Sequence, residues 1–350
     1  MSGLGNLRGK LILGLVLGIV VVAALSVYAD FNKMVEVLSN FNWWLLPLIL
    51  GFTLFNYVLR FYKWDVYLRL IGATGVAKTD SALIFTSGFA MAMTPGKVGE
   101  VLKSYLLKQL RGTPIATSAP VVMAERVTDG IAMLVLASVG LVLFDYGTPI
   151  LVTIAVLAVV FLAIMQNRAL FNKLLSWGER LPRVSRGVHH FHAFYDSSYE
   201  LFRLPNLLFG VGIGAISWSG EVVSLVLVMM GLGVEFSWIL VIICSFVLSA
   251  STLIGSVTLL PGGLGTADAS ITGMLLFLIP RYTTFPIEQN VAVAATLLIR
   301  FATLWFGVGL GLIALTIMQR RLGRISLPEG EADADTEAAA PSEPVPAERL

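Results

Sequence analysis

MTPGKVGE, residues 93–100, breaks an apolar segment with a Pro-Gly pair, and LPGGLGTAD, residues 260–268, repeats the break. Both stretches contain the core Pro-Gly-x-x-Gly, and a carboxylate follows each core, Glu100 in the first and Asp268 in the second. Proline ends an incoming helix because it has no backbone N–H, and glycine permits the tight turn that follows. The sequence therefore predicts two similar helix breaks, far apart in the chain.

The sequence around these breaks has the composition of a membrane protein. Of its 350 residues, 57% are hydrophobic and 13% are charged, and the mean hydropathy is +0.84. Soluble domains have about 25% charged residues, and an apolar run of 18 or more residues is typical of a membrane-spanning helix. The single cysteine, Cys244, is expected to be a small core residue, since it has no second cysteine to pair with. We therefore predict an all-α polytopic integral membrane protein.

Six apolar runs are long enough to cross the ~30 Å hydrocarbon layer as helices. They are residues 11–29, 43–59, 121–144, 149–166, 207–230 and 291–318. Two further apolar regions are divided by the breaks, the first into residues 81–94 and 98–110 and the second into residues 238–260 and 264–279. Their short halves predict re-entrant hairpins or broken helices within one transmembrane domain, residues 1–319.

Basic residues indicate the orientation of the chain. They gather before the first span, after the second, in the connection 167–205 and after the last span, whereas the other connections are poor in Lys and Arg. We predict that all four clusters and both termini are cytoplasmic, in the plasma membrane. The two hairpins then enter from opposite sides, which makes units 43–144 and 207–318 an inverted repeat of the kind found in transporters. If each hairpin were instead two helices that cross the membrane completely, the connections would lie on the same sides.

Two segments outside the spans have distinct compositions. The connection 167–205 alternates Leu, Phe and Trp with basic residues, which fits either an amphipathic helix on the membrane surface or a plain cytoplasmic linker helix. The tail 320–350 is predicted to be disordered and cytoplasmic, because residues 329–350 hold seven acidic residues and one Arg among Ala, Pro and Ser.

Ionisable residues inside a membrane are costly and usually functional. Glu221 and Arg300 each stand alone within an apolar span. We expect Arg300 to pair with Glu221 or Asp268, either in the wall of a polar cavity or in an ion pair that only joins helices. Glu125 and Arg126 are expected near an interface, where long side chains reach water.

The breaks suit an anion, because the helix after each break begins with unpaired N–H groups and a positive dipole end. Lys97 adds a full charge to the first break, and glycines allow close backbone approach in the second. The predicted substrate-binding residues are Pro95, Gly96, Lys97, Gly99, Glu100, Lys103, Glu125, Arg126, Asp129, Glu221, Pro261, Gly262, Gly263, Gly265, Asp268 and Arg300.

Motifs for other chemistry are missing from the sequence. It contains no His-Glu-x-x-His zinc motif and no Walker lysine loop. His189, His190 and His192 have no cysteine or further histidine near them, so we interpret them as interfacial or cytoplasmic residues rather than a metal site. We expect no catalytic residue, metal, cofactor or nucleic-acid partner.

Several motifs together resemble the flippase-like transmembrane domain of the lysylphosphatidylglycerol synthase family, over about residues 11–318. They are RFYKW, TPGKVGEVLKSYLL, MAERVTDGIAML, GEVVSLVLVMMGLG, LPGGLGTADA and the span that contains Arg300. The family's Pro-x-x-x-Gly-Glu is matched by Pro95, Gly99 and Glu100, its Glu-Arg-x-x-Asp by Glu125, Arg126 and Asp129, and its late Pro-Gly-Gly-x-Gly by residues 261–265.

Two positions depart from the family pattern. Lys103 stands where the family usually has Arg, and Asp268 stands where it commonly has Glu. Both departures keep the sign of the charge, but a lysine lacks the bidentate fork with which arginine binds a phosphate.

The resemblance implies lipid translocation between leaflets, since this domain moves an aminoacylated phospholipid in the bifunctional family members. The aminoacyl-transfer domain of those members has no counterpart in this sequence, so we do not expect an enzyme. The expected partners are membrane lipids with a phosphate headgroup, and possible further partners are a second copy or a lipid-synthesis enzyme. The alternatives are a membrane-embedded enzyme acting on a phospholipid or polyprenyl phosphate and an accessory protein of such an enzyme.

Overall fold

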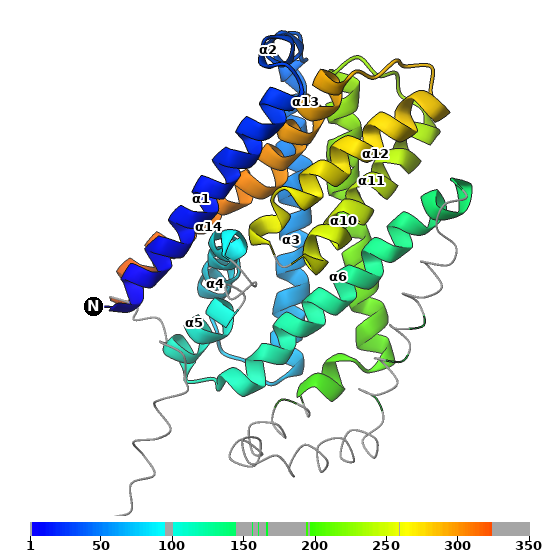
Figure 1. The fold of residues 1–350 in the computed structure, drawn as a ribbon. Coiled ribbons are helices and arrows are strands. Elements are labelled where there is room, and N and C mark those ends of the chain that lie inside the picture. Colours follow the sequence, from blue (N-terminus) through cyan, green and yellow to red (C-terminus); the bar gives the residue numbers. More distant parts are fainter. Residues whose placement is uncertain are drawn as a thin grey trace, which may run out of the picture.

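The computed structural model describes residues 2–94, 101–144, 197–258 and 260–323 and the single positions 156, 160, 166 and 194, with side chains from residue 13 on except that of Met93 (Figure 1). This part of the chain is helical and contains no strand, which confirms the all-α class. Its helices are α1 (Ser2–Tyr28), α2 (Phe31–Ser39), α3 (Leu46–Leu70), α4 (Lys78–Ala90), α5 (Val101–Arg111), α6 (Ile115–Leu143), α10 (Leu204–Gly231), α11 (Trp238–Val257), α12 (Thr266–Tyr282), α13 (Gln289–Arg300) and α14 (Phe306–Leu322). Single turns η1 (Trp43–Leu45), η2 (Met91–Met93), η5 (Pro261–Gly263) and η6 (Phe301–Trp305) join or extend them.

Six helical stretches in the described residues are long and apolar enough to cross a membrane. They are Trp43–Leu70, Ile115–Leu143, Leu204–Gly231, Trp238–Val257, Pro261–Tyr282 and Gln289–Leu322. Three of the predicted spans, 43–59, 207–230 and 291–318, lie within these stretches, and a fourth, 121–144, does so except for its last residue. The predicted span 11–29 falls mainly in α1, which bends by 96° into α2 after Tyr28.

Other sequence predictions fall outside the described residues. These are the span 149–166 apart from three single positions, most of the connection 167–205, and the tail beyond residue 323.

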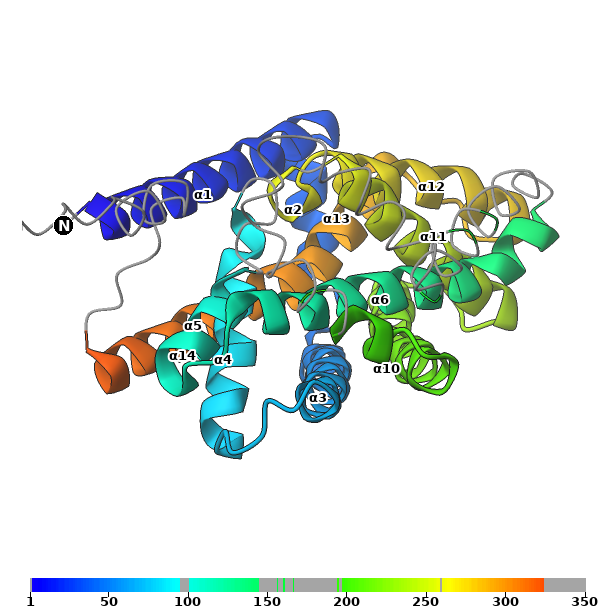
Figure 2. The ribbon, with the colours of Figure 1, turned by 90° about the horizontal axis from the view of Figure 1, so that it is seen from below.

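The helices pack in long pairs that bring distant parts of the sequence together. Helix α10 packs along α3 and α6, α11 packs along α12 and α6, and α14 packs along α4. Seen from below, α3 and α10 lie side by side near one edge, and α1 runs along the opposite edge (Figure 2). Figures 1 and 2 also place the start of α1 and the end of α14 toward the same end of the molecule.

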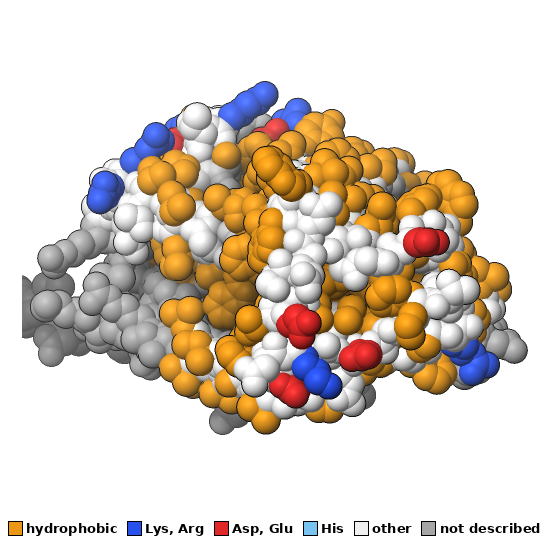
Figure 3. All heavy atoms as spheres, turned by 90° about the horizontal axis from the view of Figure 1, so that it is seen from above, with side chains coloured by type: hydrophobic (Ala, Val, Ile, Leu, Met, Phe, Trp, Pro, Cys, Tyr) orange, Lys and Arg blue, Asp and Glu red, His pale blue; other side chains and the backbone are white. Residues whose placement is uncertain are grey.

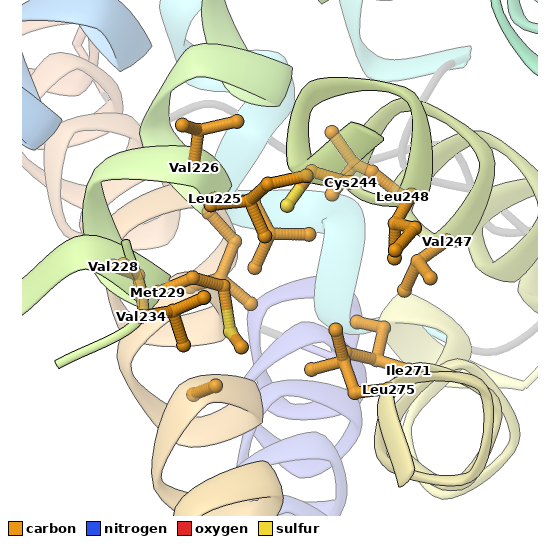
Figure 4. Close-up of a cluster of buried hydrophobic side chains, with 14 of the residues drawn as sticks. Leu225, Val226, Val228, Met229, Val234, Cys244, Val247, Leu248, Ile271 and Leu275 are labelled. Atoms are coloured by element: carbon orange, nitrogen blue, oxygen red, sulfur yellow. The ribbon is translucent and has the colours of Figure 1, made fainter. Parts of the chain in front are cut away.

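A hydrophobic core joins α10, α11 and α12 (Figure 4). Leu225 and Met229 of α10 contribute to it with Cys244 of α11 and Leu275 of α12, and all four side chains are fully buried. Cys244 therefore is the small core residue that its apolar sequence neighbours predicted. The outer surface is also apolar: the face in Figure 3 carries mainly hydrophobic side chains, with charged residues in a few small groups.

Glycines allow some helices to approach at backbone distance, as is common in membrane proteins. A Cβ placed on Gly311 of α14 would lie 2.2 Å from the backbone nitrogen of Ala90 in α4. A Cβ on Gly220 of α10 would lie 2.9 Å from the carbonyl oxygen of Phe52 in α3. The absence of a side chain at these two glycines allows α14 to approach α4, and α10 to approach α3, at backbone distance.

The second predicted break is present between α11 and α12. Helix α11 ends at Val257, and Gly262, Gly263 and Gly265 follow with φ angles of 59°, 66° and 81°. These values lie in the left-handed region that glycine adopts without the strain other residues incur. The first predicted break lies between α4 and α5, where residues 95–100 are outside the described part of the chain.

The two broken regions meet inside the molecule. The turns η2 and η5, which end α4 and follow α11, contact each other. Figure 1 shows α4 and α5 in the lower half and α11 and α12 in the upper half, with their breaks facing each other. Helices α4 and α5 have 13 and 11 residues, so each is shorter than the ~30 Å hydrocarbon layer at ~1.5 Å per residue. Neither half of the first region is long enough to cross alone, as a hairpin requires. The prediction of short halves was wrong for the second region, because Trp238–Val257 and Pro261–Tyr282 are each long enough to cross, and the inverted repeat stays a prediction.

Candidate functional site

A cavity of about 220 Å³ lies where the two broken regions meet. Its wall includes Met91 and Ala92 from η2, Gly262 and Gly263 from η5, and residues of α3, α4, α5, α6, α10, α11, α13 and α14. In the part of the chain that the structure describes, five charged side chains line it: Arg60, Lys103, Arg126, Glu221 and Arg300. A polar cavity thus lies within an apolar helix bundle.

Arg300 holds the second break in place. Its Nε lies 2.7 Å from Asp268 Oδ1, and its Nη2 donates a hydrogen bond of 2.7 Å to the carbonyl oxygen of Gly262. The other carboxylate oxygen of Asp268 accepts a hydrogen bond of 2.8 Å from the Gly265 N–H. Of the two partners expected for Arg300, Asp268 is therefore the one that pairs with it. The same carboxylate accepts a backbone hydrogen bond at the start of α12.

Asp129 of α6 neutralises two cations of α3. It forms an ion pair with Lys63, and its Oδ2 lies 3.6 Å from Arg60 Nε. Lys63 is fully buried and Arg60 is 7% exposed. Both residues belong to the basic cluster that was predicted to follow the second span, at the membrane surface. That placement was wrong, because α3 continues to Leu70 and carries both residues on one face, three positions apart.

Lys103 of α5 pairs with Glu125 of α6, with 2.5 Å between Nζ and Oε2. The ammonium group also lies 4.6 Å from the ring centroid of Trp64 and 5.2 Å from that of Phe85, within the range of cation–π attraction. Glu125 is 1% exposed. The Glu125 side chain therefore does not reach water, contrary to what was expected for a residue near an interface: its Oε2 pairs with Lys103, while its Oε1 is buried with no hydrogen-bond partner among the described residues.

Glu221 differs from the other buried carboxylates. It is 5% exposed, and it has no ion-pair partner within 4 Å among the residues of the described part. Trp218, one turn earlier on α10, and Ser251 of α11 line the same cavity. The Trp218 Nε1 and Ser251 Oγ atoms are buried and have no hydrogen-bond partner within the described ranges. The described wall of the cavity therefore has a carboxylate, an indole N–H and a hydroxyl that can form hydrogen bonds with a ligand.

The described wall of the cavity holds cations whose carboxylate partners lie behind it. Arg60, Lys103 and Arg300 each face the cavity, whereas their partners Asp129, Glu125 and Asp268 lie outside its lining. Among the described residues, four cations, with Arg126 as the fourth, thus line the cavity together with the carboxylate of Glu221. Such a wall favours an anion, and arginine guanidinium groups match phosphate oxygens in particular.

The structure brings most of the predicted site residues together. Lys103, Arg126, Glu221, Gly262, Gly263 and Arg300 line the cavity, while Glu125, Asp129, Gly265 and Asp268 support it from behind and Pro261 is buried in the turn next to it. Five predicted residues of the first break lie outside the described part of the chain: Pro95, Gly96, Lys97, Gly99 and Glu100.

Sequence reasoning missed Arg60, Lys63, Tyr57, Trp218 and Ser251 as site residues. The repeating three- to four-residue spacing of polar residues in NYVLRFYKW, residues 56–64, was the available signal, because it places Asn56, Arg60 and Lys63 on one helical face. No sequence pattern distinguishes Ser251 or Trp218 from other polar residues in a helix. In the described ranges, no three His, Cys, Asp or Glu side chains come together in the manner of a metal site.

Comparison with known proteins places these features in a family. The sequence model of the family described as "Lysylphosphatidylglycerol synthase TM region" matches residues 12–311. A "UPF0104 membrane protein" of Methanothermobacter thermautotrophicus is 26% identical over 86% of this chain and 93% of its own length. A UPF0104 membrane protein of Methanocaldococcus jannaschii is 22% identical over 89% of this chain and 95% of its own.

A further relative has a different name. "Glycosyltransferase AglD" of Haloferax volcanii is 24% identical over 78% of this chain, and the match covers 50% of that protein. This chain is therefore similar to only about half of that protein's length.

Proposed function

The chain belongs to the lysylphosphatidylglycerol synthase TM-region family of multi-pass membrane proteins, and from that premise we propose that it moves a lipid with a phosphate-bearing headgroup between the leaflets of the plasma membrane. The observation that carries this proposal is the cavity between the two broken regions, whose described lining holds four cations and one carboxylate. A charged cavity inside an apolar bundle costs free energy, and such sites usually mark the path of a polar substrate.

The cavity suits a headgroup that is more than a phosphate. Arg300, Arg126 and Lys103 supply cationic donors for phosphate oxygens. The unpaired carboxylate of Glu221 accepts hydrogen bonds, and the indole of Trp218 and the hydroxyl of Ser251 donate them. We infer a headgroup with an amine or several hydroxyl groups next to the phosphate.

The mechanism follows from the opposed broken regions. In transporters with broken helices, a site near the membrane centre opens to either side as one half of the protein moves against the other. Here the headgroup would pass between η2 and η5 while the hydrocarbon chains remain in the bilayer. Helices α14 and α4 on one side and α11 and α12 on the other would move as the packed pairs that they form.

A second candidate function is supported by the relative named "Glycosyltransferase AglD". In this alternative, the chain acts on a glycolipid or polyprenyl phosphate as an enzyme, or assists such an enzyme. Activity that requires a divalent metal, or stable co-purification with a lipid-synthesis enzyme, would favour the alternative over translocation.

The proposal is tested in liposomes with a leaflet-resolved assay. The purified protein is reconstituted with fluorescent phospholipids that differ in headgroup, and the fraction accessible to dithionite is followed with time. We expect movement of at least one anionic lipid above that in empty liposomes, lost in Arg300→Ala and kept in Arg69→Ala, whose guanidinium is on the surface. Rates equal to those of empty liposomes for every headgroup would contradict the proposal. Mass spectrometry of the co-purified lipid would name the substrate.

A further inference from the structure

A second cavity, of about 400 Å³, lies between α1 and the second broken region. Its lining is apolar except for two residues, Asp268 and Arg300. The apolar wall is formed by Val21, Val22 and Leu25 of α1, by Leu264, and by Leu297, Phe301 and Trp305. We call this cavity the α1 groove.

The α1 groove opens to the outside of the helix bundle. Val22 is 38% exposed and Phe301 is 51% exposed, and both lie in its wall. In a membrane, this opening faces the hydrocarbon layer. The floor of the groove, in contrast, holds the ion pair of Arg300 and Asp268, whose side chains are 14% and 5% exposed.

Arg300 belongs to both cavities. It lines the central cavity and the α1 groove, and the lining of each is otherwise different. The described contacts of its guanidinium are the Nε contact with Asp268 and the Nη2 hydrogen bond to Gly262, which leaves N–H donors for a ligand. Arg300 lies where a polar cavity meets an apolar groove. In a bound lipid, the headgroup meets the hydrocarbon chains at a similar boundary.

Local backbone geometry builds this boundary. The π-helical turn η6 begins directly after Arg300, and π-turns in helices are frequent at functional sites. Phe301 and Trp305, its first and last residues, both line the groove. Helix α1 lies close against the indole, since a Cβ on Gly18 would lie 2.5 Å from Trp305 Cη2.

We propose that the α1 groove binds a hydrocarbon chain of the lipid whose headgroup lies in the central cavity, with Arg300 at the junction of headgroup and chain. This inference rests on the proposed function and adds the route by which the substrate enters from the bilayer. The apolar lining, the opening at Val22 and Phe301 and the shared arginine support this occupant.

Photolabelling distinguishes this bound chain from the ordinary lipid around the protein. The full chain is reconstituted in phosphatidylcholine vesicles that contain an anionic phospholipid with a diazirine in the middle of one acyl chain, and the adducts are mapped by mass spectrometry. Labelling by surrounding lipid follows exposure, so it favours Ile19 and Val20, which are 66% and 56% exposed. The proposal expects the groove residues Val21, Leu25 and Trp305 to carry more label than these two.

Groove-filling variants provide the second measurement. Val21→Trp and Leu25→Trp place a large side chain in the groove, and Val20→Trp is the matched control on the same helix. We expect a fall of about tenfold in labelling of Trp305 in either filled variant and no change in the control, because a well-packed site does not accept the extra volume. The elution volume and Tm of each variant verify that it is folded.

The outcomes separate this inference from the proposed function. Groove labelling without lipid movement in the liposome assay would support the chain site and contradict the translocator. Lipid movement with labelling that follows exposure, and with equal rates in Val21→Trp and Val20→Trp, would overturn the chain site alone. Cross-linking of α1 to a second copy in place of lipid adducts would also overturn it.

Discussion

The guanidinium of Arg300 lies 2.7 Å from the carboxylate of Asp268 and so ties α13 to the first turn of α12. The two residues are 32 positions apart in the chain, and the same carboxylate accepts the N–H of Gly265. One ion pair therefore stabilises the second break, provides a cation for the central cavity and forms the floor of the α1 groove.

Removing one member of this pair should destabilise the protein. Asp268→Asn leaves the buried charge of Arg300 without a counter-ion, at a cost of about 3 kcal/mol in the free energy of unfolding. The double variant Asp268→Asn with Arg300→Gln should lose less than the sum of the two single variants, by about 2 kcal/mol, because no unpaired charge remains. Unfolding by denaturant in detergent micelles measures all four states of this cycle. Additive losses would show that the pair contributes no coupling.

Neutralising Glu221 should affect transport more than stability. The carboxylate has no ion-pair partner among the described residues, so Glu221→Gln breaks no ion pair there, and the loss of a buried charge offsets other losses. The free energy of unfolding should therefore fall by less than about 1 kcal/mol. Lipid movement should fall about tenfold, because the cavity loses the one carboxylate of its described lining. Glu235→Gln, at an exposed position before α11, is the control for both measurements. Equal transport in the two variants would exclude a role of Glu221 in binding.

The break at η5 should require glycine at residue 263. Gly263→Ala imposes a side chain on a φ of 66° and brings its Cβ to 3.1 Å from Gly255 Cα, so we expect a loss of at least about 1–2 kcal/mol. Gly273→Ala in α12 is the opposite case, since its Cβ meets nothing within 4 Å and alanine favours a helix by about 0.5–1 kcal/mol. Thermal unfolding should therefore shift in opposite directions in the two variants, and the same shift in both would contradict the geometry of the break.

The close contact of α14 and α4 should depend on Gly311. A larger side chain there meets the backbone of Ala90, so Gly311→Leu should cost about 3 kcal/mol or prevent folding. Gly309→Leu lies two residues earlier, where a Cβ meets nothing within 4 Å, and should leave the Tm almost unchanged. Monodispersity in size-exclusion chromatography and the Tm provide the measurement. Tolerance of Gly311→Leu would mean that the two helices are not in backbone contact.

The orientation of the two hairpins is tested by labelling from one side of the membrane. Thr74 lies in the exposed connection before α4, and Thr284 lies in the exposed connection after α12. In a Cys244→Ser background, an impermeant maleimide should label Thr284→Cys in intact cells and Thr74→Cys only after permeabilisation, because cytoplasmic termini place these connections on opposite sides. Labelling of both from the same side would exclude the predicted topology.

Much of the fold could be predicted because it depends on local composition and spacing. The apolar runs from 121 to 144 and from 207 to 230 indicated α6 and α10, and the Pro-Gly-x-x-Gly core at residue 261 indicated a turn between two helices. Arg60 and Lys63 show where this reasoning was insufficient. Basic residues after an apolar run usually mark the membrane surface, but here they lie inside, since Asp129 of a distant helix neutralises them.

The sequence by itself determined the all-α membrane class, the helix break at Pro261 and the set of charges that a membrane interior makes costly, because these depend on neighbouring residues and on the solvent. The tertiary structure determined the partners of those charges. Arg300 joins Asp268 rather than Glu221, Lys103 joins Glu125, and the cations turn toward the cavity with their carboxylates behind them. Ion pairing acts over a few ångströms between helices that are far apart in the chain, so only the packing of those helices selects the pairs.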